Sequence, residues 1–165
     1  MNRRTGRAQI LALLLFVSAM SACGFHLQGA VTIPRDMERT YIETVDRHSL
    51  FYRELRLQLK AAGVQLVDSS ADATAIFSIL VDDTDQRVLS VSARNVPTEY
   101  EVYYSVRYSL TGEERRLLES QFVTLTRDYT YDETLVLGKA LEEDQMRNAI
   151  VADLVRIVLR QIASL

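Results

Sequence analysis

The sequence predicts an α+β domain in which two amphipathic helices pack on one face of a three- to four-stranded mixed, largely antiparallel sheet. Three observations predict it: apolar and polar residues alternate over residues 98–111, apolar residues recur at helical spacing over 50–62, and a longer apolar stripe covers 139–164. A chain of 165 residues, 48% hydrophobic and 25% charged, is long enough for one such domain. Two helices cover only one face of the sheet, so we expect the other face to be polar and accessible.

The first strand and helix follow from local composition. β-branched and aromatic residues over 40–45 predict a strand. Ser49 is placed to cap a helix that ends at Gly63. A brief extended segment over 64–67 and a loop over 68–72 should follow.

Residues 73–92 are expected to form one long strand with a possible interruption. The interruption would be Asp82-Asp83-Thr84-Asp85, which could also suggest a calcium site. This run lacks the glycine and the distal glutamate of an EF-hand loop, so we interpret it as a solvated strand break.

The alternating residues over 98–111 predict a half-buried antiparallel strand. The turn Thr111-Gly112-Glu113-Glu114 should return the chain as a partner strand over 117–131. Six of the eight tyrosines lie between 100 and 131. Cross-strand packing under a helix explains them better than an aromatic ligand site does.

The C-terminal segment predicts a long helix over 139–164. Its first turn carries Glu142, Glu143 and Asp144, and Arg156 and Arg160 lie near its end, an order that suits the helix dipole.

Residues 1–22 have the features of a secretory signal. Three arginines precede an apolar run over 10–17, and small residues follow over 18–22. The run is well short of the roughly 20 residues that a membrane-spanning helix needs. Removing this segment takes away three positive charges from a chain of formal net charge −3, so the rest is distinctly acidic.

The lone cysteine, Cys23, follows the small residues of this segment. Met20-Ser21-Ala22-Cys23 resembles the bacterial lipobox, in which the cysteine is acylated; a buried free cysteine is the alternative. A multiply acylated cysteine is a durable membrane anchor. Gly24 at the next position points, by the same resemblance, to the outer membrane on its periplasmic side.

No combination of residues predicts catalysis. Asp46, His48 and Ser49 are neighbours in sequence, but a triad is a spatial arrangement, and this stretch lacks the glycine of a nucleophile elbow. Ser49 is better explained as a helix cap and His48 as a solvated loop residue. With Cys23 acylated, no thiol remains as a nucleophile or metal ligand. The acidic balance argues against nucleic-acid binding. We expect a non-enzymatic protein without a metal or cofactor.

Two cations stand out by their position. Arg94 lies at the tip between two long strands, and Lys139 follows Gly138 where the last strand leads into the C-terminal helix. Binding residues concentrate at such element ends. A plain solvated cation is the alternative for each.

Several short motifs match one known family in the same order. The run Cys23-Gly24-Phe25-His26-Leu27-Gln28-Gly29 resembles the mature start of the LPS-assembly lipoproteins of the LptE family. Further resemblances are Leu59-Lys60-Ala61-Ala62-Gly63-Val64, Arg94-Asn95, Thr98-Glu99-Tyr100, Arg127-Asp128-Tyr129 and Val136-Leu137-Gly138-Lys139. The ordered set, together with the lipobox, carries the resemblance.

The resemblance implies a non-enzymatic outer-membrane lipoprotein that plugs and supports assembly of the LptD β-barrel and takes part in delivering lipopolysaccharide (LPS) to the outer leaflet. It implies a signal peptide over 1–22, a lipidated N-terminus and tether over 23–37, and a single domain over 38–165. An acidic domain does not attract an anionic glycolipid overall, so LPS contact should fall on local cations. Arg94 and Lys139 are the first candidates, and Arg87 is a third.

Two other classes of function remain as alternatives. A scaffold lipoprotein of another envelope complex, such as one for β-barrel assembly, would share the anchor and the amphipathic sheet. A small periplasmic hydrolase would need a nucleophile–base pair or a cleft with perturbed acids, and the sequence shows neither.

Overall fold

The computed structural model describes the backbone of residues 32–130 and 136–165, and their side chains apart from 136–140 and 142. The chain divides into two compact units, Met1–Ala30 and Val31–Leu165. All described residues belong to the second unit.

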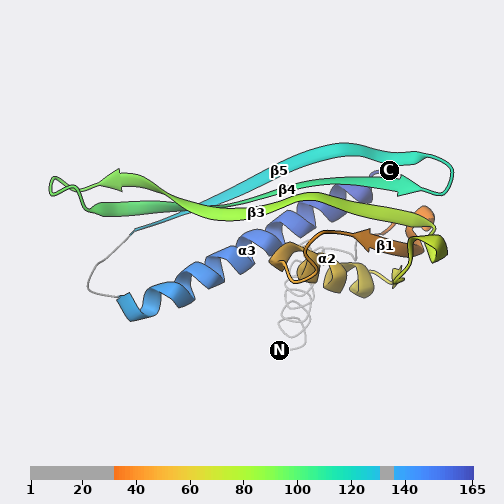
Figure 1. Cartoon of the computed structure of the whole chain (residues 1–165), viewed down its shortest axis with the longest axis horizontal. Helices are drawn as coiled ribbons and strands as arrows, with labels where there is room; N and C mark the ends of the chain where they lie inside the picture. The colour runs from red at the N-terminus through yellow and green to blue at the C-terminus, as the bar shows by residue number, and fades with distance from the viewer. Residues whose placement is uncertain (1–31, 131–135) are drawn as a thin grey trace, which may run out of the picture. The chain divides into compact units, whose positions relative to one another are not determined.

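The second unit is built on one mixed sheet of five strands in the order β2-β1-β3-β4-β5. The strands are β1 (Arg39–Glu43), β2 (Gln65–Leu66), β3 (Ala75–Val91), β4 (Pro97–Gly112) and β5 (Arg116–Thr130). β1 runs parallel to β2 and β3, whereas β3, β4 and β5 form a long antiparallel meander (Figure 1). The expected fold class is therefore confirmed, and the strand count exceeds the expected three to four because the brief 65–66 segment pairs with β1.

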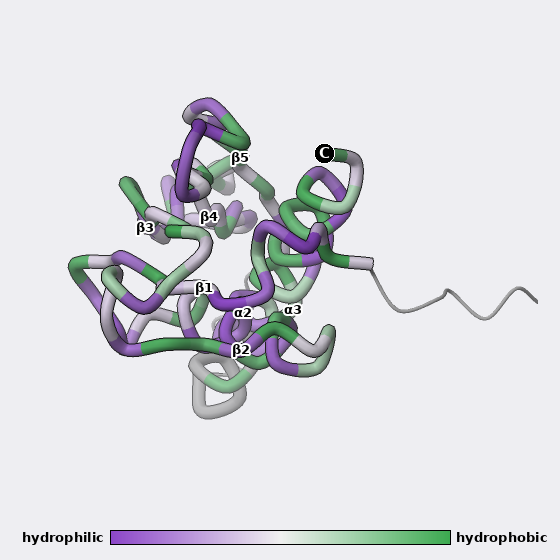
Figure 2. The backbone as a smooth tube through the Cα atoms, turned by 90° about the vertical axis from the view of Figure 1, so that its right-hand side faces the viewer, coloured by the Kyte–Doolittle hydropathy of each residue, from purple (hydrophilic) through white to green (hydrophobic). Residues whose placement is uncertain are grey.

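Two helices cover one face of this sheet. They are α2 (Leu50–Ala61) and α3 (Val136–Ile162), and 3₁₀ turns form at Arg35–Met37 and Ser70–Asp72. Figure 2 shows α2 and α3 together on the same side of β3, β4 and β5. The Ser49 cap is confirmed, since its hydroxyl accepts a hydrogen bond of 3.1 Å from the Tyr52 amide. α3 begins three residues before the expected start, because its glycine-containing first turn shows no helical apolar pattern in the sequence.

The core lies between the helices and the alternate residues of β4. Tyr104 and Tyr108 are buried in it, as the packing interpretation of the tyrosines predicts, and Tyr108 stacks on Phe77 with ring centroids 5.4 Å apart. The other buried apolar residues of α3 and β4 are Ile150, Val151, Leu154, Val155, Val158, Leu159, Ile162, Val102, Val106 and Leu110. Met37, which the sequence places in the tether, is fully buried, so the packed unit includes the end of that segment.

The run Asp82–Asp85 does not interrupt the strand as expected. The register between β3 and β4 shifts between Ile79 and Val81, which leaves Leu80 as an extra residue and reverses which side chains face the helices. Asp82 therefore points inward, where its carboxylate accepts hydrogen bonds from Ser49 and from Tyr104, at 2.5 and 2.6 Å. These bonds satisfy a carboxylate that would otherwise disfavour a strand, so β3 continues to Val91.

Candidate functional site

The hairpin that joins β3 to β4 ends in a tight turn over residues 92–96. The Asn95 amide donates to the Ser92 carbonyl at 2.9 Å, and the Ser92 amide donates to the Val96 carbonyl at 2.7 Å. Asn95 has a φ of 61°, a left-handed conformation that asparagine tolerates better than most residues. This turn holds Arg94 at the tip, where the sequence places it.

Arg94 is an exposed cation at the end of a hairpin whose first strand exposes apolar side chains near the tip. The side chains of Val88, Leu89 and Val91 on the strand leading to the tip are 48%, 45% and 53% exposed. Arg94 has no ion pair among the described side chains. An unpaired guanidinium beside exposed aliphatic groups suits a ligand that has both a phosphate and an acyl chain.

Arg87, the third candidate, is already paired. Its guanidinium lies 2.5 Å from Oε2 of Glu101, whose side chain is 11% exposed, and the contact is an ion pair without good hydrogen-bond alignment. Glu101 on β4 pairs in register with Asp128 on β5, so Arg87 compensates an acidic part of the sheet. This pairing leaves Arg87 less charge to offer a ligand than Arg94 has.

Lys139 lies in the first turn of α3, which begins at Val136, whereas the sequence places it where the helix starts. Its side chain is outside the described part of the structure, as is Cys23. The start of α3 and the β3–β4 tip lie toward the same end of the sheet (Figure 1). The two predicted cations therefore belong to segments at the same end of the sheet. Their joint role in binding stays a prediction.

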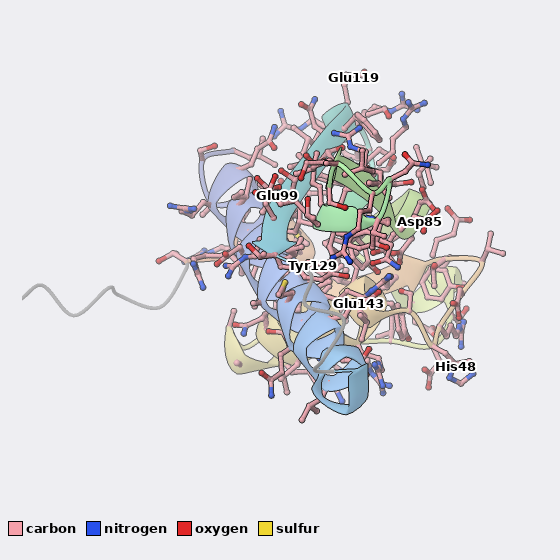
Figure 3. All side chains as sticks on the ribbon, turned by 90° about the vertical axis from the view of Figure 1, so that its left-hand side faces the viewer. His48, Asp85, Glu99, Glu119, Tyr129 and Glu143 are labelled. Carbon is pink, nitrogen blue, oxygen red and sulfur yellow. The ribbon has the colours of Figure 1, made fainter. Side chains whose placement is uncertain are left out.

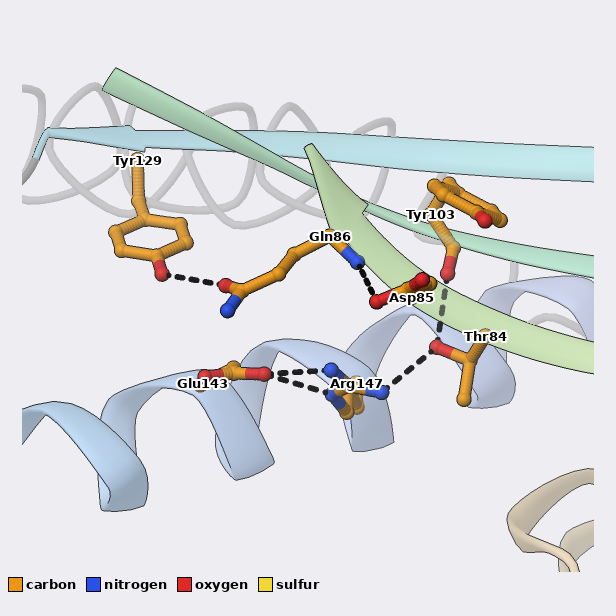
Figure 4. A network of polar contacts seen from close by, with 7 residues as sticks. All are labelled: Thr84, Asp85, Gln86, Tyr103, Tyr129, Glu143 and Arg147. Carbon is orange, nitrogen blue, oxygen red and sulfur yellow. Dashed lines mark hydrogen bonds and ion pairs between the residues drawn. The ribbon is translucent and has the colours of Figure 1, made fainter. Parts of the chain in front are cut away.

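A polar network joins the N-terminal half of α3 to β3 (Figure 4). Arg147 binds the Glu143 carboxylate at 2.5 Å and donates to the Thr84 hydroxyl at 3.1 Å, and Thr84 in turn donates to the Tyr103 carbonyl at 2.8 Å. Nearby, the Tyr129 hydroxyl donates to Gln86 at 2.9 Å. Sequence reasoning missed Arg147, since only the tertiary register brings it to β3. The network fixes α3 against the strands that lead to the tip.

The sheet face opposite the helices is polar, as expected. Ser105 and Thr124 share a hydrogen bond of 2.9 Å across β4 and β5, and Arg107 lies over the exposed ring of Phe122 at 5.2 Å from its centroid. Figure 3 shows the charged side chains Asp85 and Glu99 around the strands at the tip end. This face offers many hydrogen-bonding groups and few apolar ones.

Asp46, His48 and Ser49 take part in the loop and in the cap of α2. His48 is an exposed loop residue whose amide donates to Asp46, and the Ser49 hydroxyl is engaged with Asp82. Within the described ranges, no group of three or more His, Cys, Asp or Glu side chains could hold a metal ion. Among the same residues, no helix is both long and apolar enough to cross a bilayer.

Comparisons with known proteins agree with this geometry. Residues 37–162 match the family model described as LptE, lipopolysaccharide-assembly. An LPS-assembly lipoprotein LptE of Pectobacterium atrosepticum is 26% identical over 157 residues, covering 90% of this chain and 83% of that protein. That of Yersinia enterocolitica is 29% identical over 105 residues, which cover 61% of this chain and half of the relative.

Solved structures share the fold. The solution structure of a lipoprotein B from Nitrosomonas europaea has a TM-score of 0.70 at 27% identity, covering 86% of this chain and 91% of that one. The crystal structure of a minor lipoprotein from Acinetobacter baumannii has a TM-score of 0.64 at 22% identity, covering 78% and 92%. The five-stranded sheet with two helices on one face is thus a fold found in bacterial lipoproteins.

The match over 37–162 identifies the family. The chain belongs to the LptE lipopolysaccharide-assembly family. Membership gives it a role in lipopolysaccharide assembly, and it does not favour the alternative of a scaffold for another envelope complex.

Proposed function

We propose that this chain is a non-enzymatic outer-membrane lipoprotein that acts as a plug inside the LptD β-barrel, supports the assembly of that barrel, and contacts lipopolysaccharide during its delivery to the outer leaflet. In this proposal residues 1–22 are a signal peptide, Cys23 carries the acyl chains, residues 23–37 are the lipidated N-terminus and tether, and residues 38–165 form the working domain.

The open polar face of the sheet is the observation that carries the proposal. A large outer-membrane barrel has a polar lumen, so a plug needs a hydrogen-bonding exterior around a closed apolar core. The five-stranded sheet supplies both: its helix face is buried, and its other face presents hydroxyl and charged side chains such as Ser105, Thr124 and Arg107.

The hairpin tip supports the LPS contact. The domain is acidic, so the attraction for an anionic glycolipid must be local. Arg94 is exposed, unpaired among the described side chains and flanked by apolar groups, and Lys139 lies in the first turn of the helix that extends toward the same end.

Co-purification from detergent-solubilised outer membranes tests the plug. We expect the tagged chain to bring down a large β-barrel in equal amounts, and Cys23→Ser to lower that yield by losing the anchor. Recovery of a different partner in equal amounts would overturn the proposal.

An LPS pull-down tests the cations. Arg94→Asp with Lys139→Asp should reduce LPS capture by about tenfold or more, because two attractive charges become repulsive. The exposed pair Arg35→Asp with Arg160→Asp makes the same charge change elsewhere and is the matched control. Equal capture by both double variants would contradict the assignment.

A further inference from the structure

A basic groove lies at the carboxyl ends of the parallel strands β1 and β2, beside α2. It has a volume of about 520 Å³ and is lined by the strand residues Tyr41, Ile42 and Leu66 and by residues of α2 and the adjoining loops. Ligands of open α/β units commonly bind outside the carboxyl ends of parallel strands. The groove therefore occupies a place where binding sites form, although nothing in the proposed function uses it.

The lining of the groove is cationic. Arg47, Arg53, Arg56 and Lys60 contribute four positive charges, and Asp68 is the one acidic side chain in its described lining. This concentration occurs in a chain whose formal net charge is −3. An anion bound in the groove would be attracted to all four cations and would offset the repulsion among them.

The cations are free to bind a ligand. None of the ion pairs among the described residues involves any of the four. Arg53, Arg56 and Lys60 lie three and four residues apart on α2 and so share one side of the helix, where like charges destabilise it. Arg47 donates only a long hydrogen bond of 3.4 Å, to the hydroxyl of Tyr41, which also lines the groove.

We propose that this groove binds the phosphate groups of a phosphorylated sugar. Arginine forks bind phosphate oxygens through paired hydrogen bonds, and Arg53 and Arg56 offer two such forks one helical turn apart. The volume exceeds what a single phosphate would fill, and the Tyr41 and Tyr52 side chains in the lining add hydroxyl groups for a sugar.

The groove is separate from the hairpin tip. Ser49, next to the lining residue His48, bonds to Asp82, and roughly 30 Å of extended strand separates Asp82 from Val91 at about 3.3 Å per residue. His48 and Glu99 also lie well apart in Figure 3. The groove proposal therefore does not depend on the tip contact or on the barrel plug.

Calorimetric titration of the full-length chain in detergent with glucose 1,6-bisphosphate tests the site, with glucose as the neutral control. Arg53→Gln with Arg56→Gln should weaken bisphosphate binding by about tenfold or more, since two charge-assisted contacts are lost. Arg53→Lys with Arg56→Lys should retain part of the affinity, because charge remains but the fork is lost. Binding should also weaken as salt is raised.

The matched control removes the same charge elsewhere. Arg35 and Arg160 are exposed and line no part of the groove, so Arg35→Gln with Arg160→Gln should change the affinity less than about twofold. Circular dichroism should show that both double variants keep the native fold, since every substituted side chain is exposed.

The source of the sugar phosphate is resolved by repeating the titration with LPS in detergent micelles. If Arg53→Gln with Arg56→Gln weakens the binding of both probes, the site is supported and its ligand is a glycolipid headgroup. If the variant weakens the binding of the bisphosphate alone, the site is supported and its ligand is a soluble sugar phosphate. Absence of bisphosphate binding, equal weakening by the control variant, or preferential binding of polyglutamate would overturn the proposal. Arg94→Asp should leave bisphosphate binding intact, so failure at the tip and failure at the groove are distinguishable.

Discussion

The Tyr104 hydroxyl donates a 2.6 Å hydrogen bond to the Asp82 carboxylate at the point where β3 passes the N-terminus of α2. The same carboxylate accepts from Ser49, the cap of α2, and the Phe51 amide donates to the Tyr104 oxygen at 3.2 Å. One acidic side chain thus connects the cap of a helix to two strands of the sheet.

Replacing Asp82 should be costly although it lies in a run of acids. Asp82→Ala removes the acceptor of two hydrogen bonds and leaves the buried Tyr104 hydroxyl without its partner, so we expect unfolding to become easier by about 2–3 kcal/mol. Urea denaturation measures this as a lower midpoint at unchanged slope. Asp83→Ala, at the exposed neighbouring position, should stay within about 0.5 kcal/mol. Similar midpoints for both variants would contradict the assignment.

Alkaline pH should destabilise the fold through its buried tyrosines. Burial raises the pKa of Tyr108 to about 12, and burial together with Asp82 also raises the pKa of Tyr104. The unfolded state loses these protons first, near pH 10, so the stabilising effect is complete below about pH 10 and declines as the pH rises toward 12.

A titration of stability against pH checks the Tyr108 contribution. Tyr108→Phe should show a shallower decline between about pH 10 and 12 than the unsubstituted chain, even though loss of the 2.6 Å bond to Gln161 lowers its stability at neutral pH. Leu110→Ala lowers core packing without removing a titrating group, so its decline should keep the original steepness. An unchanged slope in Tyr108→Phe would refute the explanation.

Arg87 and Arg94 should differ in what they support. Arg87→Ala leaves Glu101, which is 9% exposed, without its counterion, so we expect a loss of about 1 kcal/mol in stability and less than twofold change in LPS capture. Arg94→Ala removes an exposed cation that has no ion pair among the described residues, so it should lower LPS capture and leave stability nearly unchanged. Thermal unfolding and LPS pull-down of both variants measure the difference, and an exchange of the two outcomes would show that the roles are assigned wrongly.

Arg147 should hold the N-terminal half of α3 to the sheet. Arg147→Ala removes its contacts with Glu143 and Thr84, so amide hydrogen exchange over residues 141–150 should quicken by about tenfold while the C-terminal half of the helix stays protected. Arg156→Ala, which breaks a more exposed pair within the helix, serves as the control and should change exchange little. Uniform acceleration along all of α3 would indicate a global effect instead.

Much of the fold was predictable because it depends on local patterns. The alternation along residues 98–111 correctly predicted which side of β4 is buried, and the spacing of apolar residues predicted both helices and the Ser49 cap. The tip position of Arg94 also followed from the sequence, since a short polar turn between two long strands must lie at a hairpin end.

The tertiary structure decided what depends on register between distant segments. A single extra residue at Leu80 reverses the faces of β3 and brings Asp82 inward, and no local pattern shows where such a bulge will fall. The pairing of Arg87 with Glu101 and the gathering of Arg47 with the cations of α2 likewise need strands and helix to be placed first. Periodicity in the chain specifies which residues an element buries. Long-range packing specifies which polar groups come into contact. In this protein, packing pairs Arg87 with Glu101 and leaves the cations of the groove without an ion pair among the described residues.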